Sequence, residues 1–326
     1  MKRSSHIFEK ICTIENIHLA FYKAAKQKRT SKSYLTFRTN CEQKLNEVRC
    51  SLSQGTYTPG AYKTITITDP KQRIISIAPF SDRIVHHAIM NVLEPLFERQ
   101  MICHTYACRK HKGTHRAARY AFQKAHGSEW FLKLDVKKYF DSISHEVLKR
   151  HLFRIIKCER TLALLCTIID SYTAPLSADS SDACTRGLPI GNLTSQFFAN
   201  LYLSPLDHFV VEKLHPNGYV RYMDDMILFF ASREAAKNAL CAIECFCATV
   251  LNLQFNAPTV AQTKCGIPFL GWRILPHRVA LLQKTKRRMK RTLHRIQTDW
   301  ERGTISDDTA FMKAMCVTSC RKIQTV

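Results

Sequence analysis

Residues 218 to 230 read Gly-Tyr-Val-Arg-Tyr-Met-Asp-Asp-Met-Ile-Leu-Phe-Phe, with no Pro and no second Gly in the run. Valine, tyrosine, isoleucine and phenylalanine favour strands, whereas the adjacent Asp224 and Asp225 resist burial. The stretch therefore predicts a β-hairpin with a pair of carboxylates at its tip. Two carboxylates in an apolar setting repel each other, and a hard divalent cation such as Mg2+ offsets that repulsion and can also bind phosphate. Ordinary turn residues are the alternative interpretation.

A third carboxylate far upstream favours the metal-site interpretation. Asp135 ends the apolar run Trp130-Phe-Leu-Lys-Leu-Asp135, which predicts another strand. The interval between Asp135 and the hairpin is long enough for helical crossovers to bring the two strands together in one sheet. The three carboxylates would then converge on a pair of metal ions suited to phosphoryl transfer.

The chain is strongly basic, with 49 Lys and Arg against 26 Asp and Glu and a formal net charge of +23. Basic residues gather in 26–32, in 109–119 and above all in 284–295. Such segments would follow a phosphate backbone and release its counterions, so a nucleic acid is the expected partner. A solvated face is the alternative for each charge run. Anionic lipid is the weaker alternative, because no apolar face has the size that an interfacial helix needs.

Composition predicts a soluble, cytoplasmic protein, with 45% hydrophobic residues and no segment of membrane-spanning length. The first residues carry basic side chains without an apolar stretch behind them, so no secretory signal is expected. None of the 14 cysteines forms a C-x-x-C pair. We therefore expect buried free thiols rather than disulfides or a zinc site.

The order of predicted strands, loops and helices divides the chain into three zones, 1–128, 129–275 and 276–326. The first contains two strands, 62–70 and 73–79, joined by a turn, and then a helix that Asp82 could cap. The second contains the strand that ends at Asp135 and a helix through about Tyr172.

A glycine loop over 187–196 follows in the second zone, and a helix is expected to begin at Phe197. Loop residues at the start of a helix expose N–H groups that can hold phosphate or a base pair. The third zone predicts a cationic helix with one narrow apolar seam, formed by Met289, Leu293, Ile296 and Trp300.

These motifs, taken in chain order, resemble those of a reverse transcriptase. The motifs are Tyr222-Met-Asp-Asp225, the strand ending at Asp135 with Tyr139 and Phe140 behind it, the Gly191 loop, and Phe269-Leu-Gly-Trp272. The resemblance covers roughly residues 20 to 300. It implies an α+β right-hand polymerase, with an N-terminal region and fingers (1–128), a palm of antiparallel sheet plus helices (129–275) and a short helical, basic thumb (276–326).

The resemblance also implies an RNA-directed DNA polymerase that uses two Mg2+ ions. Asp135 and Asp224 would hold the metals, with Val136 beside them, and Asp225 would support them from the hairpin tip. The implied nucleotide-binding residues are Lys71, Arg73, Phe140, Ile190, Gly191, Gln196 and Met223. Among them Phe140 matches a steric gate that excludes a 2′-hydroxyl, with an ordinary core aromatic as the alternative, whereas Tyr139 is expected to pack.

Two further sets match positions that contact nucleic acid. Phe269, Leu270, Gly271 and Trp272 match a primer grip, and simple core packing explains the same residues equally well. The second set comprises six of the basic residues of the third zone, Lys284, Lys286, Arg287, Arg288, Lys290 and Arg291.

The loop resembles that of reverse transcriptases from diversity-generating retroelements. Most family members have Gln before the glycine and end the motif in Ser-Pro, whereas this chain has Ile190 before Gly191 and ends in Ser195-Gln196. Residues 106–115 and 192–200 look like the same subgroup. That resemblance implies copying of a template-repeat RNA into cDNA with misincorporation opposite adenine, for mutagenic retrohoming. The implied partners are template RNA, cDNA or primer, deoxynucleoside triphosphates and a small basic accessory protein, with no membrane.

Three alternatives stay open at this point. A faithful reverse transcriptase of a group II intron or a retron-like element would share every catalytic residue. A metal-dependent nuclease also clusters carboxylates, and a catalytically silent RNA-binding protein would keep the basic surface. Two departures from the family pattern stand out. The region 256–264 has no unambiguous match to the lysine that many polymerases use to protonate pyrophosphate, although Lys264 is a candidate, and the tail 307–326 lacks the subgroup's aromatic and His-bearing end.

Overall fold

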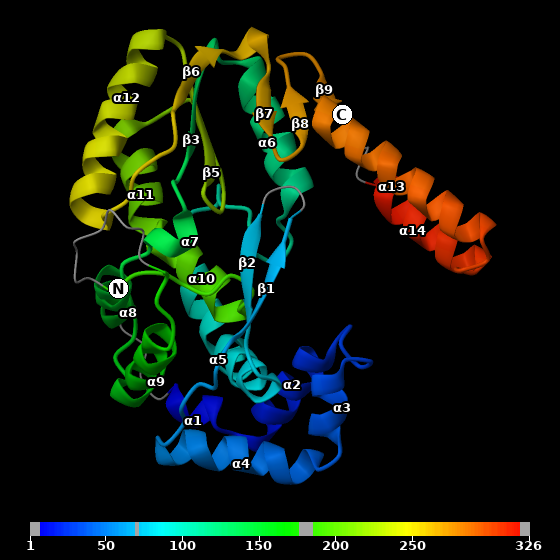
Figure 1. Cartoon of the computed structure of the whole chain (residues 1–326). Helices are drawn as coiled ribbons and strands as arrows, with labels where there is room; N and C mark the ends of the chain where they lie inside the picture. The colour runs from blue at the N-terminus through cyan, green and yellow to red at the C-terminus, as the bar shows by residue number, and fades with distance from the viewer. Residues whose placement is uncertain (1–6, 69–71, 176–184, 320–326) are drawn as a thin grey trace. The chain divides into compact units, whose positions relative to one another are not determined.

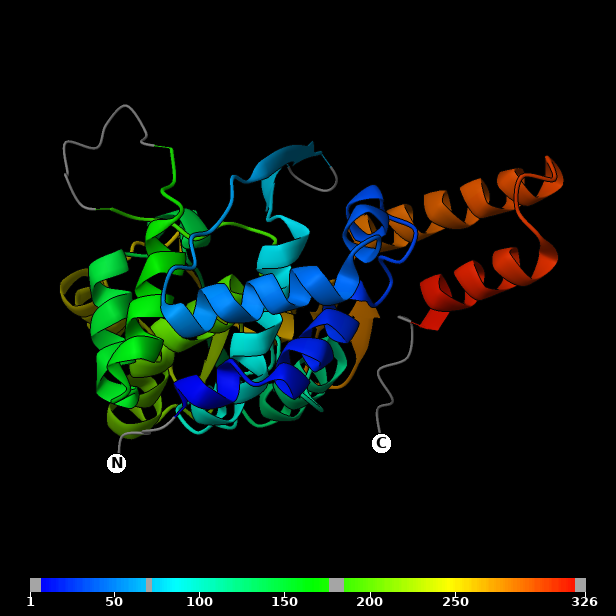
Figure 2. The same cartoon turned by 90° about the horizontal axis from the view of Figure 1, so that it is seen from below.

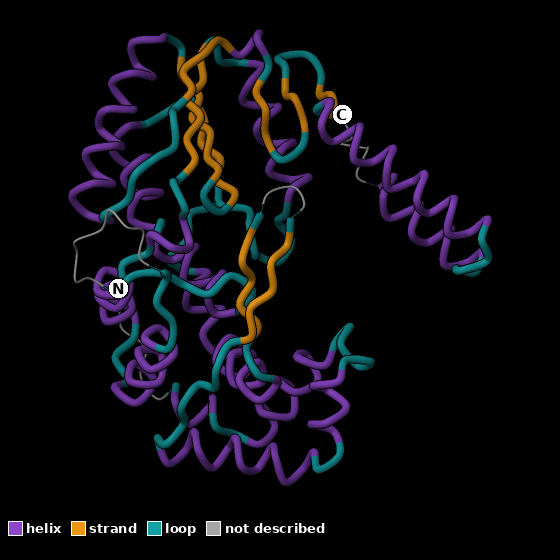
Figure 3. The backbone as a smooth tube through the Cα atoms, in the orientation of Figure 1, coloured by secondary structure: helices purple, strands orange, loops and turns teal. Residues whose placement is uncertain are grey.

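The computed structural model describes residues 7–68, 72–175 and 185–319. Helices predominate in this part of the chain, which also forms three antiparallel sheets (Figures 1 and 3). Contacts divide the chain into two compact units, each made of three separate segments. Unit 1 comprises Met1–Ile102, Lys137–Asp207 and Phe246–Gln254, and unit 2 comprises Cys103–Val136, His208–Cys245 and Phe255–Val326. The zone boundaries at 128 and 275 remain predictions.

Unit 1 is built around one long apolar helix, α5 (Phe80–Glu98), whose buried side chains include Ile84, Ala88, Leu93 and Phe97. Ile84 and Leu93 lie on opposite sides of the helix, so α5 is packed by other helices on more than one side. The other helices of unit 1 are α1 (Phe8–Ile11), α2 (Ile14–Ala25), α3 (Lys32–Arg38), α4 (Cys41–Gln54), α7 (Tyr139–Ser142), α8 (His145–Ile155), α9 (Glu159–Asp170), α10 (Leu193–Tyr202) and most of α11 (Ser204–Phe209).

The two strands predicted in the first zone are confirmed. They form the antiparallel pair β1 (Lys63–Ile67) and β2 (Arg73–Ile77), and Lys71 lies outside the described residues. The predicted cap was wrong. Helix α5 begins at Phe80, so Asp82 lies inside its first turn, where the carboxylate accepts the Gly60 N–H at 2.8 Å and burial raises its pKa.

Two helix boundaries in the second zone differ from the prediction. The single helix expected before Tyr172 is divided into α7, α8 and α9, and the Ser144 hydroxyl accepts from the Val147 N–H at the start of α8. Helix α10 begins at Leu193 rather than Phe197, so the loop covers 187–192 and Ser195 and Gln196 are helical. Buried Thr194 and Ser195 explain the difference, because packing against the protein interior overrides their preference for turns.

Unit 2 contains the sheet that carries the predicted hairpin. Its order is β4-β5-β3-β6, so β3 lies between β5 and β6 (Figure 1). A second sheet has the order β7-β8-β9. The bounds are β3 (Trp130–Asp135), β4 (Gly218–Tyr222), β5 (Asp225–Phe230), β6 (Thr259–Gln262), β7 (Ile267–Phe269), β8 (Trp272–Ile274) and β9 (Val279–Leu281), and the helices are α6 (Thr114–His126), most of α12 (Arg233–Phe246), α13 (Gln283–Glu301) and α14 (Asp307–Ser319).

One face of the first sheet is covered by α6 and by the β7–β8 hairpin. Phe131 of β3 pairs directly with Phe229 of β5, so the two side chains point to the same face of the sheet. There they pack with Phe269, Trp272 and the alanines of α6, which are Ala117, Ala118, Ala121 and Ala125. The small alanine side chains let the helix lie close to the sheet.

Helices α13 and α14 run side by side (Figures 1 and 2). The apolar seam predicted on α13 is only partly buried, because Ile296 is 8% exposed and Trp300 is 48% exposed. No helix in the described ranges is both long and apolar enough to cross a membrane.

The prediction of buried thiols was wrong. Of the cysteines that the structure describes, all free, Cys247 alone is buried, and Cys50, Cys103, Cys108, Cys241, Cys245, Cys265 and Cys316 are exposed. Burial raises the pKa of Cys247 to about 12. Cys241 and Cys245 lie on α12, on the side of the helix that faces away from the protein interior.

Candidate active site

The predicted hairpin is present, and its turn is tight. Tyr222 pairs with Asp225, so Met223 and Asp224 form a two-residue connection between β4 and β5. Met223 has a φ of +58°, a conformation that usually selects glycine in such a turn. A bulky residue held there stores strain of about 1 to 3 kcal/mol, which persists only where the surroundings enforce it.

Arg221 supports this turn from inside the protein. Its side chain is fully buried, and Nη1 donates to the Met223 carbonyl at 3.0 Å. The Arg221 N–H donates to the His104 carbonyl and its own carbonyl accepts from the Tyr106 N–H, both at 3.0 Å. The segment before α6 therefore holds the strand that leads into the turn.

The strand register brings the predicted carboxylates to one end of the sheet. Asp135, the last residue of β3, lies directly opposite Asp225, the first residue of β5, and Asp224 precedes it in the turn. Directly opposed residues on antiparallel strands have Cβ atoms about 5 Å apart. Val136 follows Asp135, is buried, and pairs with Phe255 in an isolated bridge.

Asn256 orients the carboxylate of Asp135. Its side-chain Nδ2 donates to Asp135 Oδ2 at 2.6 Å, and its backbone N–H donates to the Asp135 carbonyl at 2.8 Å. The sequence analysis missed Asn256. No local pattern marks this residue, because its position depends on how the segment before β6 returns to the end of β3.

Asp225 has an unusual electrostatic environment. Its side chain is 23% exposed, and Lys133 Nζ lies 3.2 Å from Oδ1. Burial, opposed by Lys133 and helped by the Asp135 and Asp224 charges, raises the pKa of Asp225 to about 6. A desolvated carboxylate beside two others favours the approach of a cation. Sequence reasoning also missed Lys133, although a charge between Leu132 and Leu134 was a usable signal.

The chemistry of this donor set fits a hard divalent cation. In the part of the chain that the structure describes, no group of three or more His, Cys, Asp or Glu side chains is arranged as a complete metal site. Mg2+ needs no such cage, because it usually binds one or two carboxylates together with substrate phosphates and water. Asp135 and Asp225, with Asp224 in the turn, supply the oxygens for that mode of binding.

The residues matched to nucleotide binding, apart from Met223, belong to unit 1. Arg73 begins β2 and is exposed, and Phe140 lies in α7 with its ring 5.8 Å from that of Tyr139. Tyr139 is buried, and its hydroxyl donates to the Ala199 carbonyl, which confirms the expected packing role. Gln196 lies in the first turns of α10 and is half-buried.

The loop with Ile190 and Gly191 is joined to β2 by its backbone. The Ser76 N–H donates to the Ile190 carbonyl at 2.9 Å. Gly191 has a φ of +121°, and a Cβ there would lie 2.8 Å from the Ser76 carbonyl oxygen and 2.9 Å from Cγ2 of Ile75. This position therefore requires glycine for two reasons, its backbone conformation and the close approach of β2.

Core packing accounts for two of the residues matched to a primer grip. Phe269 is 1% exposed and Trp272 is 5% exposed, and both side chains belong to the core cluster under α6. Leu270 and Gly271 form the turn between β7 and β8, with φ of +49° and +92°. Leu270 is half-buried and packs against the same core cluster. The six basic residues of α13 that were matched to nucleic-acid contact are all exposed.

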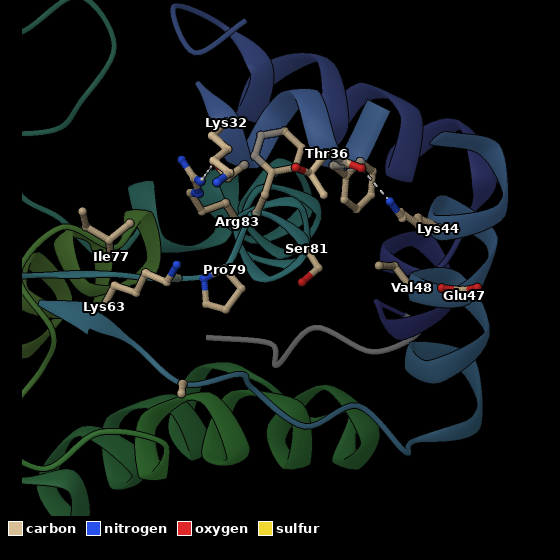
Figure 4. A pocket seen from close by; sticks show the side chains of 15 residues that line it. Lys32, Thr36, Lys44, Glu47, Val48, Lys63, Ile77, Pro79, Ser81 and Arg83 are labelled. Atoms are coloured by element: carbon tan, nitrogen blue, oxygen red, sulfur yellow. Dashed lines mark hydrogen bonds between the residues drawn. The ribbon is translucent and has the colours of Figure 1, made fainter. Parts of the chain in front are cut away.

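A cationic hollow in unit 1 was not predicted. Its volume is about 810 Å³, and its lining includes Lys32, Lys44, Lys63 and Arg83 against one acid, Glu47. In Figure 4, Lys63 lies at one end, and Lys44 and Glu47 lie at the other. Arg83 Nη2 donates to Ser33 Oγ at 3.1 Å, and the Arg83 guanidinium lies over the Phe80 ring. The surplus of positive charge suits an anionic ligand.

Solved structures with this fold are polymerases of the right-hand class, so the predicted α+β class is confirmed. The chain is similar to the apo telomerase from Candida tropicalis truncated from its C-terminal domain, with a TM-score of 0.52 and 14% identity over 70% of this chain and 55% of that chain. It is similar to the Candida tropicalis telomerase in complex with a TWJ fragment of telomeric RNA, with a TM-score of 0.52 and 12% identity over 84% of this chain and 56% of that chain.

The family follows from the sequence. The model of the reverse transcriptase (RNA-dependent DNA polymerase) family matches residues 65–274, and the chain belongs to that family. The match includes the strand that ends at Asp135, the Gly191 loop, the hairpin with Asp224 and Asp225, and the β7–β8 turn.

Three curated relatives share 24 to 27% sequence identity with this chain. The putative COX1/OXI3 intron 1 protein of Saccharomyces cerevisiae is 25% identical over 54% of this chain and 22% of its own length. The group II intron-encoded protein LtrA of Lactococcus lactis subsp. cremoris is 27% identical over 52% of this chain and 29% of its own length. The chain thus spans less than a third of these two relatives. Protein YkfC of Escherichia coli K12 is 24% identical over 72% of each chain.

Proposed function

We propose that this protein is an RNA-directed DNA polymerase that extends a primer by two-metal nucleotidyl transfer. The observation that carries the proposal is the register of the sheet, which sets Asp135 opposite Asp225 with Asp224 in the adjoining turn. Asp135 and Asp224 would hold the ions, beside Val136. Two Mg2+ ions held there would supply Lewis-acid activation of the primer 3′-hydroxyl and would offset negative charge on the reacting phosphate and on the leaving pyrophosphate.

The chain's own residues would prepare this site before substrate binds. Asn256 fixes the Asp135 carboxylate by a 2.6 Å hydrogen bond, and Arg221 fixes the turn through the Met223 carbonyl. Both interactions hold a charged or strained group in one geometry, which lowers the reorganisation needed during the reaction.

Primer extension on a defined RNA template, with Mg2+ and four deoxynucleotides, tests the proposal. Growth of a labelled primer would support it. Shortening of the primer would instead indicate a metal-dependent nuclease, and retained RNA binding without any nucleotide addition would indicate a catalytically silent RNA-binding protein. The assay should be repeated with a small basic accessory protein and template RNA, the partners that we propose for this enzyme. We also propose a cytoplasmic location, where template RNA and deoxynucleoside triphosphates are both present.

We assign the nucleotide-binding roles in unit 1 by the family pattern. Arg73 and Lys71 would grip the incoming triphosphate, because a guanidinium can hold phosphate and also lie over a base. Phe140, half-buried in α7, would press on the sugar and favour deoxynucleotides. Gly191 and Gln196 would lie beside the nascent pair, with Met223 below the primer end.

We further propose that the enzyme serves a diversity-generating retroelement and misincorporates opposite template adenines. The supporting observation is Ile190, whose side chain offers no donor or acceptor where most family members have Gln. The loop that carries it is fixed to β2 through the Ile190 carbonyl, and the Ile190 side chain is half-buried. The alternative is a faithful enzyme of a group II intron or a retron-like element, and the similarity to LtrA fits that alternative equally.

Ile190→Gln is expected to lower misincorporation opposite adenine severalfold while leaving extension measurable. A Gln side chain would restore hydrogen bonding around the nascent pair, and a site that reads hydrogen bonds rejects mismatched groups more strongly. Sequencing of cDNA from one RNA template measures the change, with Ile190→Leu as the apolar control. An identical error spectrum for Ile190→Gln and the unchanged enzyme would remove this explanation.

The basic helix α13 is proposed to follow the phosphate backbone of the primer and template. In a double variant Lys286 and Lys290 are replaced by Gln, and the binding constant for primer–template should depend less steeply on salt. The slope of its logarithm against the logarithm of salt concentration should shrink in magnitude by about 0.7 to 0.9 for each phosphate that the helix no longer neutralises. Lys213→Gln with Lys237→Gln is the matched control, because both lysines are exposed on other elements and the change in net charge is the same. Equal slopes for the two double variants would argue against the role of α13.

A further inference from the structure

We propose that Lys133 is a positioning residue that links the Asp225 carboxylate to the backbone of strand β7 at Pro268, next to the β7–β8 turn. The proposal rests on the polymerase function given above and deepens it, because it joins the proposed metal-binding hairpin to the segment matched to a primer grip. Neither the family match nor the relatives assign a role to this lysine.

The position of Lys133 in the sheet is the first step. Along β3, Phe131, Lys133 and Asp135 share one face, and Lys133 pairs with Ile227 of β5 and Thr259 of β6. Phe131 and Ile227 belong to the apolar core on that face. Lys133 therefore stands where the apolar core ends and the carboxylates begin. A charge on a packed face is unfavourable unless it has partners.

The second step is the identity of its partners. Asp225 is a diagonal neighbour of Lys133 across the β3–β5 ladder, a separation that a long side chain can span. The ammonium group lies 3.2 Å from Asp225 Oδ1 and donates to the Pro268 carbonyl at 2.7 Å. The Lys133 side chain is 21% exposed, so both interactions are partly shielded from water.

The third step is what this link holds in place. Pro268 immediately precedes Phe269, whose side chain is anchored in the core, and the turn at Leu270 and Gly271 follows. Strand β7 is only three residues long, so few backbone hydrogen bonds fix the direction of this turn. Lys133 adds a charge-assisted hydrogen bond from the central sheet. One ammonium group thus positions a catalytic carboxylate and the adjacent turn together.

Two measurements on the whole protein test the link: fluorescence anisotropy of a labelled primer–template without nucleotide, and steady-state primer extension. For Lys133→Met we expect binding about tenfold weaker or more, a raised KM for primer–template and a lowered kcat. Lys133→Arg should restore most of the binding affinity and most of kcat, since a guanidinium can reach two acceptors. Lys237→Met, an exposed lysine on α12, is the matched control.

A second variant separates positioning from simple charge neutralisation. Lys133→Met with Asp225→Asn also removes the carboxylate charge that Lys133 faced, so the binding defect should persist if the contact with Pro268 matters. Restored binding in this double variant, or unchanged binding in Lys133→Met, would overturn the proposal. Thermal melting identifies a variant that fails to fold. If Lys133→Met does not fold, the primer–template binding constants of Lys133→Arg and Lys133→Gln test the positioning role in its place.

The same assays separate a failure of the Lys133 link from a failure of the proposed function. If the unchanged enzyme extends primers and Lys133→Met behaves like it, the positioning role alone fails. If the unchanged enzyme extends no primer, the polymerase proposal fails, and the binding measurement still reports on the link.

Discussion

Asp224→Ala is expected to abolish primer extension, with a residual rate at least about a thousandfold below that of the unchanged enzyme. The loss follows from the geometry of the turn, where Asp224 adjoins the directly opposed Asp135 and Asp225. Removing it deletes a proposed metal ligand while the strands on both sides keep their pairing. Single-nucleotide addition under saturating substrate measures the rate.

Two controls make this result specific. Asp308→Ala, an exposed carboxylate on α14, should leave the rate unchanged. Binding of primer–template by Asp224→Ala should remain within a few fold, because the proposed backbone contacts lie on α13. Chelation of Mg2+ should stop the unchanged enzyme reversibly. Normal extension by Asp224→Ala would contradict the assignment of the active site.

Gly191→Ala is expected to destabilise the protein by about 2 to 4 kcal/mol and to reduce extension strongly. The methyl group would meet the Ser76 carbonyl oxygen at 2.8 Å and Ile75 at 2.9 Å, and the φ of +121° is unfavourable for alanine. The loop would have to move away from β2, which would carry Ile190 with it. Thermal melting should show a fall of several degrees.

Gly113→Ala is the matched control for this substitution. Gly113 has a similar φ of +103°, but nothing lies within 4 Å of the position where its Cβ would be. Gly113→Ala therefore measures the cost of backbone strain without a steric clash, about 1 to 3 kcal/mol. If both variants melt at the same temperature, the close approach of β2 to Gly191 is not important for stability.

The hairpin with Asp224 and Asp225 was predictable because the signal is local. Alternating strand-forming residues flank two charges, and the tip is the one place where those charges avoid burial. The strands β1 and β2 were predictable for the same reason. The start of α10 was not, because Thr194 and Ser195 favour turns in isolation and become helical only when they are buried.

The three carboxylates at the end of the sheet were predicted from sequence, whereas the two residues that contact them were not. Asn256 and Lys133 act through partners that are distant in the chain, Asp135 and Pro268 in particular. Such contacts depend on which strands become neighbours, and hydrophobic periodicity carries no information about that choice. A partner for Lys133 could nevertheless have been predicted, since a charge in the middle of an apolar strand needs one.

The interleaved connectivity of the two units has a consequence for how the chain folds during its synthesis. The chain passes from one unit to the other five times, so unit 1 lacks its last segment until Gln254 has left the ribosome. Apolar strand β3 emerges long before β5 and β6, the two strands that flank it in the finished sheet. At about 5 to 20 residues per second, this strand waits for several seconds or longer without a partner. We therefore expect aggregation of the nascent chain, rather than instability of the finished protein, to limit its yield.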